Sequence, residues 1–231
     1  MDFSPKKIAF VLLFTALVLA GSQVNFSKLV GADNQFFTLF QFFGPVPGAF
    51  LGPMVGALSV LGAQVLNIAV FGKAVSLIDA LRLLPMVFAA IYFGSVKKKN
   101  WSLIVPVLAI TAFVLNPVGG QVWFFALFWT IPFLMKFVFP NRLFAKSLGA
   151  TFTAHAVGGA IWAWTIPMTP AAWVALIPVV IFERTLFAFG ITFSYIAMNT
   201  ILARVEHLLP EGTISVNPQY DLKRMIVATV N

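Results

Sequence analysis

Long apolar runs separated by short polar or basic segments make up most of this chain. One run extends from Phe36 to Phe71. At about 36 residues it is longer than the ~20 that one membrane-spanning helix needs, but it suits two short helices. The run also contains Pro45, Pro47 and Pro53, which lack the N–H group that an unbroken helix would use there. The pattern therefore predicts a helical hairpin that turns between Pro47 and Pro53.

Glycines recur at every fourth position around this predicted turn. The phrase Gly-Pro-x-x-Gly-Ala occurs twice and contains Gly44, Gly48, Gly52 and Gly56. Glycines at this spacing let the backbones of neighbouring membrane helices come close, so we expect these four to serve helix packing and turning. The alternative is that the turn also walls a substrate cavity, because a broken helix in a membrane needs protein or water around it.

The other apolar runs predict further membrane spans. They cover residues 8–21, 77–96, 101–116, 120–138, 148–165 and 173–204. Together with the hairpin, they predict an all-α fold, a polytopic transmembrane helical bundle of about six to eight spans. We expect one transmembrane helical domain over residues 1–204 and a short cytoplasmic tail over residues 205–231.

Composition supports a membrane protein. Of the 231 residues, 60% are hydrophobic and only 10% are charged, which is too little charge to cover the surface of a soluble domain. The formal net charge is +8, but the basic residues form short clusters at the ends of apolar runs, as the positive-inside rule requires. We therefore expect this protein to interact with the lipid bilayer and not with nucleic acid.

The basic clusters also predict an orientation. An even number of spans places most clusters on one side, whereas the connecting segments 116–121 and 165–172 on the other side contain no Lys or Arg. Because cytoplasmic loops carry the excess of basic residues, both termini are expected to be cytoplasmic. The expected location is the cell membrane, with several passes. Trp162, Trp164 and Trp173 flank the segment 165–172 and are expected to form an aromatic belt at the membrane surface.

Ionisable residues inside apolar runs are candidates for function, because they are costly in a membrane. Glu183 and Arg184 lie within the last predicted span, about ten residues from its start. Adjacent helical residues point about 100° apart, so these two need not pair with each other. They form either a structural ion-pair network with Asp79, Arg82 or Lys136, or a site for a charged or zwitterionic substrate.

His155 is a second candidate. At helical spacing it shares a face with Gly158, Gly159 and Trp162, which puts one polar ring beside a groove and an aromatic side chain. It either forms a hydrogen bond to a neighbouring helix or contributes to a binding site. Asp79 and Arg82, three residues apart, are a third candidate, although they can also belong simply to the membrane interface.

Motifs of enzymes and metal sites are missing from the sequence. There is no Cys, so a thiolate metal site and a thiol nucleophile are excluded. His-Glu-x-x-His, Gly-x-Ser-x-Gly and a glycine-rich loop before Lys-Ser/Thr do not occur. We therefore expect no catalytic residue, metal or cofactor, and no enzyme activity. An intramembrane acid–base pair of Glu183 and His155 is the alternative.

Several segments resemble the substrate-binding S-components of energy-coupling-factor vitamin transporters. They are the step Ala16-x-x-x-Ala20 in the first run, the phrase Phe-Phe-Gly-Pro-Val-Pro-Gly-Ala at residues 42–49, the phrase Ala-Ile-Tyr-Phe-Gly-x-x-Lys-Lys-Lys at residues 90–99, and the closing stretch 155–184. The resemblance covers roughly residues 8–99 and 145–204. That family usually has six helices, and residues 101–138 would add a further pair.

The resemblance implies capture of a vitamin-like micronutrient from outside. Ala16 and Ala20 would contact a transmembrane coupling subunit, and separate ATPases would supply energy. The substrate site would comprise Asn34, Gln35, His155, Trp162, Glu183 and Arg184, with Glu183 or Arg184 holding a charged group and Trp162 stacking on a ring. Two other functions stay open: a stand-alone, gradient-driven carrier or channel, and a structural or accessory subunit of a larger membrane complex.

Overall fold

The fold is known from a computed structural model, which describes residues 5–28, 36–72, 76–95, 100–205, 214–223 and 225–226. This part of the chain is mostly helical, which confirms the expected helical class. The longer helices are α1 (Pro5–Gly21), α3 (Pro53–Val70), α5 (Leu84–Gly94), α6 (Ile104–Leu115), α8 (Ile131–Val138), α9 (Leu143–Thr165) and α11 (Ile177–Val205). Short helices are α2 (Pro47–Leu51), α4 (Leu77–Leu81), α7 (Pro117–Gln121) and α10 (Pro170–Ala175), and 3-10 turns occupy Leu39–Phe42, Trp101–Leu103, Trp123–Thr130 and Pro218–Tyr220.

Within the described ranges, three helical segments are long and apolar enough to cross a membrane: Pro53–Val70, Leu77–Gly94 and Ile177–Arg204. The apolar helices Lys7–Gly21, Trp101–Leu115 and Trp123–Val138 are shorter. Helix α9 has 23 residues but lacks the apolar composition of these three segments, and it packs against α5, α6, α8 and α11. A helix surrounded by other helices uses small residues for close packing, which accounts for its many Ala and Gly residues.

The predicted hairpin is correct only in its second arm. That arm is α3, whereas the first arm consists of a short strand, a 3-10 turn and irregular turns. The strand β2 (Phe36–Thr38) pairs antiparallel with β1 (Asn25–Lys28), which lies in the polar segment between the first two apolar runs. A short Phe-rich run has the same apolar pattern in a strand and in a helix, so the partner strand decides the outcome.

Backbones come into direct contact around the glycines of this region. A Cβ added to Gly48 would overlap the carbonyl oxygen of Ala90 on α5, and a Cβ added to Gly56 would lie 2.5 Å from the Cα of Gly48. At Gly44, an added Cβ would lie 2.5 Å from the sulfur of Met86. Gly52 joins α2 to α3 with a φ of 81°, a conformation that favours glycine. These residues let α2, α3 and α5 pack without intervening side chains.

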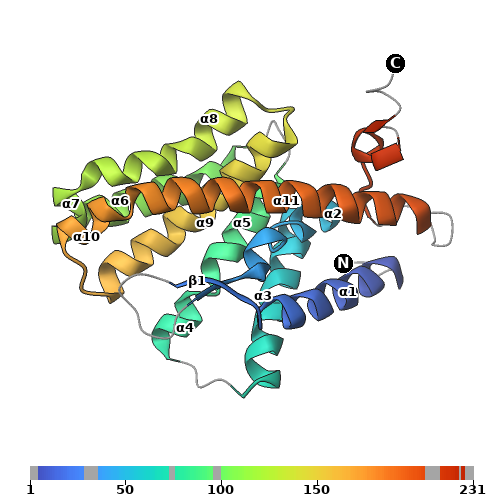
Figure 1. The fold of residues 1–231 in the computed structure, drawn as a ribbon, viewed down its shortest axis with the longest axis horizontal. Helices are drawn as coiled ribbons and strands as arrows, with labels where there is room; N and C mark the ends of the chain where they lie inside the picture. Colours follow the sequence, from blue (N-terminus) through green and yellow to red (C-terminus); the bar gives the residue numbers. More distant parts are fainter. Residues whose placement is uncertain are drawn as a thin grey trace.

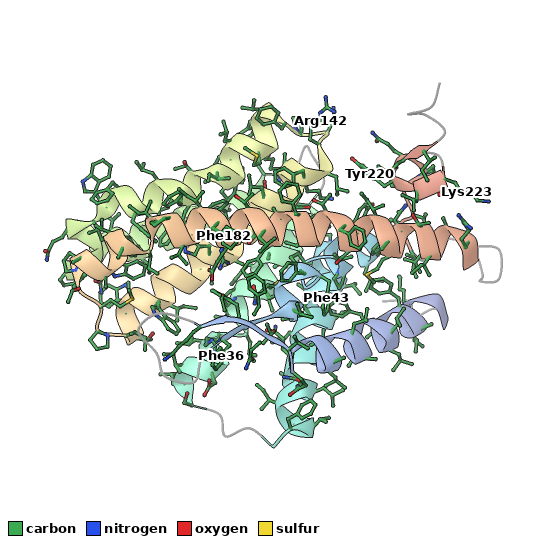
Figure 2. All side chains as sticks on the ribbon, in the orientation of Figure 1. Phe36, Phe43, Arg142, Phe182, Tyr220 and Lys223 are labelled. Carbon is green, nitrogen blue, oxygen red and sulfur yellow. The ribbon has the colours of Figure 1, made fainter. Side chains whose placement is uncertain are left out.

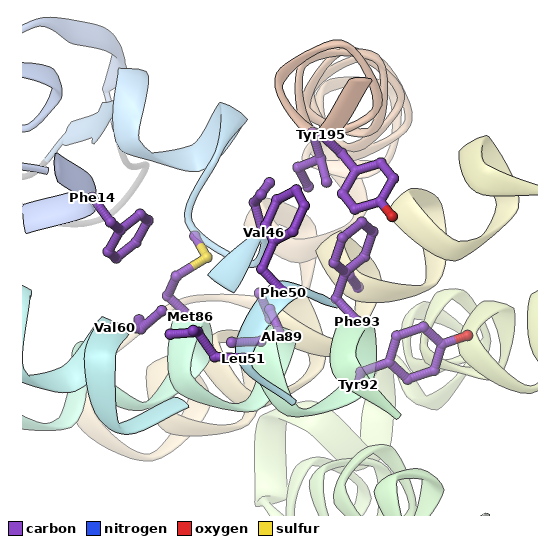
Figure 3. Packing of buried hydrophobic residues seen from close by; sticks show 14 of the residues in the cluster. Phe14, Val46, Phe50, Leu51, Val60, Met86, Ala89, Tyr92, Phe93 and Tyr195 are labelled. Atoms are coloured by element: carbon purple, nitrogen blue, oxygen red, sulfur yellow. The ribbon is translucent and has the colours of Figure 1, made fainter. Parts of the chain in front are cut away.

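Two hydrophobic clusters form the core. The first joins α1, α2, α3 and α5 to the C-terminal half of α11. Figure 3 shows its centre, where the ring of Phe50 stacks on that of Tyr195 with 5.1 Å between centroids, and Phe93 meets the same tyrosine edge-on. The second cluster contains Phe113, Trp129 and other residues of α6, the 123–130 turn, α9, α10 and the first turns of α11.

Helix α11 runs along the length of the molecule (Figure 1). In that view α1 begins and α11 ends at the same end of the molecule, whereas α7 and α10 lie at the opposite end. Figure 2 shows Arg142 and Lys223 on the side where α11 ends, and Phe36 toward the other side. The two ends of α11 thus mark the two ends of the molecule.

Part of the tail is fixed to the helical domain. The buried side chain of Asn199 donates a hydrogen bond to the Asn217 carbonyl at 2.9 Å and accepts one from the Asn217 backbone N–H at 2.8 Å. The Ser215 N–H donates to the carbonyl of Phe50 on α2 at 3.0 Å. These bonds hold residues 214–220 against α2 and α11.

Candidate ligand-binding site

A cavity of about 150 Å³ lies where the two hydrophobic clusters meet. Met86 and Ala154 on its wall belong to the first cluster, and Trp162, Trp173 and Val180 belong to the second. A cavity of this size can hold a body of about the size of benzene. Its further lining residues are Lys28, Phe37, Gln41, Arg82, Pro85, His155, Gly158, Gly159, Ile161, Leu176, Val179, Glu183 and Arg184.

The structure brings together four of the six residues expected to bind a substrate. His155 and Trp162 come from α9, Glu183 and Arg184 come from α11, and all four line the cavity. Asn34 and Gln35 lie outside the described residues. Helices α9 and α11 pack against each other, and residues three, four and seven apart share a helix face, so each pair points into the same space.

Glu183 and Arg184 form an ion pair with each other. Both side chains are buried, and Arg184 Nη2 donates to Glu183 Oε2 at 3.1 Å. The sequence did not require this pairing. A buried charge without a partner is strongly unfavourable, which explains why neighbouring side chains bend toward each other. Asp79, Arg82 and Lys136 are the residues that the sequence offered as partners in a structural network around this pair.

Those three residues make contacts of their own. Asp79 caps α4 by accepting hydrogen bonds from the backbone N–H and the hydroxyl of Ser76 at 3.1 and 2.6 Å. Arg82 Nη2 donates to the carbonyl of Phe36 at 3.2 Å, and Lys136 Nζ donates to Ser102 Oγ at 3.2 Å. Arg82 thereby connects α4 to strand β2. It also lines the cavity, as expected if Arg82 belongs to the site.

The two strands hold the ion pair in place. The Ser27 hydroxyl on β1 donates to Glu183 Oε1 at 2.5 Å, so both carboxylate oxygens of Glu183 accept a hydrogen bond. The Arg184 Cζ atom lies 4.6 Å from the ring centre of Phe37 on β2 and 4.7 Å from that of Phe187. Cation–π contacts of this kind stabilise a guanidinium group and restrict its orientation.

Two residues that line the cavity each contain a buried nitrogen atom with no hydrogen-bond acceptor among the described residues. The two atoms are Nε of Arg184 and Nε1 of Trp173, and each of these residues is only 2% exposed. Buried polar atoms are normally paired, because leaving one without a partner costs its desolvation free energy. Both atoms therefore lack, among the described residues, the acceptor that a buried donor normally has.

His155 has a defined hydrogen-bonding role. The indole Nε1 of Trp129 donates to His155 Nδ1 at 3.0 Å. A neutral imidazole that accepts at Nδ1 carries its proton on Nε2, so His155 has an N–H donor besides this bond. The position of His155 is thus compatible with both alternatives, a hydrogen bond to a neighbouring element and a role in ligand binding.

The sequence interpretation missed Trp173. It was expected in an aromatic belt, but it is buried, with its ring centre 5.0 Å from those of both Phe113 and Phe125. Trp162 is buried as well, whereas Trp164 is 58% exposed. A signal was present: positions 173, 176, 180 and 184 are three or four residues apart, which places Trp173 on the face of Arg184.

Ser27, Lys28, Phe37 and Gln41 are further site residues that the sequence interpretation missed. They come from the segments around β1 and β2, where single polar residues in a loop-like stretch carry no periodic signal. Comparison with known proteins gives no match: no protein-family model, no curated protein and no solved structure matches this chain.

Proposed function

We propose that this protein is a multi-pass protein of the cell membrane that binds a small, vitamin-like micronutrient from outside and delivers it with a partner energy-coupling module. The observation that carries this proposal is the cavity, whose lining residues Arg184 and Trp173 each have a buried donor, Nε and Nε1, without an acceptor among the described residues. The residues predicted from the resemblance to S-components and the residues around the cavity coincide at four positions. We expect no enzyme activity.

Orientation supports binding from outside. The cavity is lined by the N-terminal part of α11, whereas Arg142 and Lys223 lie on the side where α11 ends (Figure 2). The lysine- and arginine-free segments that contain α7 and α10 lie at the opposite end (Figure 1). By the positive-inside rule the end of α11 is cytoplasmic and the cavity belongs to the outer half of the membrane.

A purely structural role for the buried charges is less well supported. A helix-holding ion pair gains most when all its polar atoms are hydrogen-bonded, because each unpaired buried atom weakens it. Arg184 departs from this rule at Nε. The departure is explained if a bound molecule supplies the acceptor.

Native mass spectrometry of the purified protein tests this proposal. We expect a retained small molecule and, after mild extraction, bound membrane and ATPase subunits. Copurification of an unrelated membrane complex with no small molecule would support the structural alternative and contradict our proposal. Uptake by liposomes that contain only this protein would show a stand-alone carrier instead of a subunit.

A further inference from the structure

We propose that the ligand of this cavity is a small ring-bearing carboxylate, with its acid group on Arg184 and a hydrogen-bond acceptor at its other end on Trp173. This inference rests on the proposed function and adds the sign of the ligand's charge and the direction in which it lies. Four observations carry it: the charges of the lining residues, the unpaired donors, the bonds that Glu183 forms within the protein, and the aromatic part of the lining.

The charges on the cavity wall favour an anion. Of the described residues that line the cavity, Lys28, Arg82 and Arg184 are cationic, and Glu183 is the acidic one. A cavity with low-dielectric walls concentrates the field of such a charge set, so it attracts molecules of the opposite sign. A cationic ligand would meet net repulsion here.

Glu183 already uses both of its carboxylate oxygens in bonds within the protein. One of its carboxylate oxygens accepts from Ser27 and the other accepts from Arg184. Arg184, by contrast, keeps Nε as a donor without an acceptor. The ion pair therefore presents a hydrogen-bond donor to the ligand, while its own acidic half is occupied.

Arg184 is prepared for a carboxylate in particular. Its guanidinium group is planar and presents N–H donors in a fixed fork that matches the two oxygens of a carboxylate. The contacts with Phe37, Phe187 and Glu183 already define the plane of this group. Little side-chain freedom is then lost on binding, which favours affinity.

The apolar part of the cavity lining suits a ring with an acceptor. Trp162, Trp173 and Val180 supply aromatic and aliphatic surface there, and Trp173 adds an N–H group without a partner. Along α11, Val180 precedes Arg184 by about one helical turn, so the wall changes from apolar to charged over a short distance. A molecule with a carboxylate at one end, a flat body, and a carbonyl or ring nitrogen at the other matches this order.

Matched pairs of acids and amides test the inference. The probes are benzoate with benzamide, phenylacetate with phenylacetamide, and phenyl phosphate, each titrated into the detergent-purified full-length protein while tryptophan fluorescence is recorded. We expect the best acid to bind at least about tenfold more tightly than its amide, since a hydrogen bond to a charged group is lost in the amide. Equal affinity of acid and amide, or tighter binding of phenyl phosphate than of every carboxylate, would overturn the proposal.

Variants assign the preference to Arg184. Arg184→Gln is expected to abolish the preference for acid over amide, and the exposed Arg142→Gln, which lies outside the cavity, should keep it. If the glutamine variant does not fold, Arg184→Lys keeps the positive charge but loses the planar fork, and acid affinity should still fall about tenfold while amide affinity stays. An acid preference that survives these changes would contradict the role of Arg184.

Trp173→Phe tests the other end independently. This variant keeps an aromatic ring and removes the N–H group. It should weaken the binding of probes that carry a second acceptor, such as 4-acetylbenzoate, and leave the affinity for benzoate unchanged. Equal effects on both probes would contradict the assigned direction. If no probe binds, the molecule retained in native mass spectrometry decides: an acid supports the inference and a non-acid overturns it. The absence of any ligand would contradict the proposed function itself.

Discussion

Gly48 lies where two helices touch through their main chains. A methyl group on this residue would overlap the carbonyl oxygen of Ala90, and backbone cannot move aside as the end of a side chain can. We therefore predict that Gly48→Ala lowers the melting temperature of the detergent-purified protein by several degrees, as overpacking of a core costs about 1–3 kcal/mol.

A matched control for this change is available in the next helix. Gly62 on α3 is exposed and has no atom within 4 Å of an added Cβ. Gly62→Ala should leave the melting temperature unchanged or raise it, because alanine is a better helix former than glycine by about 1 kcal/mol. If both variants melt alike, the close backbone contact at Gly48 does not limit stability.

The Ser27 hydroxyl connects strand β1 to the buried carboxylate of Glu183. Removing it with Ser27→Ala leaves one carboxylate oxygen without its donor and should loosen the orientation of Arg184. We predict about tenfold weaker ligand binding, since hydrogen bonds to charged groups contribute about 1.5–3 kcal/mol. Isothermal titration calorimetry measures the change. Ser95→Ala only removes a hydrogen bond to the Ile91 carbonyl at the end of α5. This variant should bind the ligand with the same affinity as the unchanged protein.

At the scale of single residues, much of the candidate site could be predicted. His155, Glu183 and Arg184 are polar or charged groups inside apolar runs, which is a strong signal in one sequence. Trp173 gave a misleading signal, since a tryptophan near a predicted membrane surface is typical of an aromatic belt. Ser27 gave none, because its role depends on a carboxylate 156 residues away in the chain.

Among the elements, the helices were predictable and the strands were not. Helices α3, α5, α9 and α11 follow apolar runs whose lengths suit them. Strand β2 has three residues and β1 has four, too few for a period-2 pattern to be recognised. Their pairing needs contact between a polar segment and the start of an apolar run, and this contact forms only when the helices on either side are packed.

Helix α1 divides its residues between two faces. Phe10, Phe14 and Val18 are buried, whereas Ala16 and Ala20 are exposed on another side. If this side binds a coupling subunit, as the proposed function requires, Ala16→Leu with Ala20→Leu should block close helix approach and reduce copurified partner at least about tenfold, because small residues at such interfaces let backbones meet. Ligand binding should stay unchanged.

A control for the α1 variant uses an equally apolar but different face. Leu108 on α6 is 63% exposed and lies far along the chain from α1. Leu108→Trp should leave the amount of copurified partner unchanged. An equal loss in both variants would indicate general damage to the protein, and no loss in either would contradict the proposed contact of α1.

For the whole molecule, the proposed orientation can be tested because the chain has no cysteine. A single Arg142→Cys and a single Gln121→Cys place a thiol at opposite ends, and both positions are exposed. In intact cells, a membrane-impermeant maleimide should label Cys at position 121 and not at position 142, and permeabilised cells should show labelling of both. The reverse pattern would contradict the proposed inside and outside.

The position of the cavity between the two hydrophobic clusters has a consequence for how the protein holds together. Met86 and Ala154 of one cluster, and Trp162 and Val180 of the other, line this cavity. A molecule bound in it would contact both clusters at once. If the proposed function holds, a bound ligand therefore stabilises the contact between the two clusters, and its release is expected to loosen that contact.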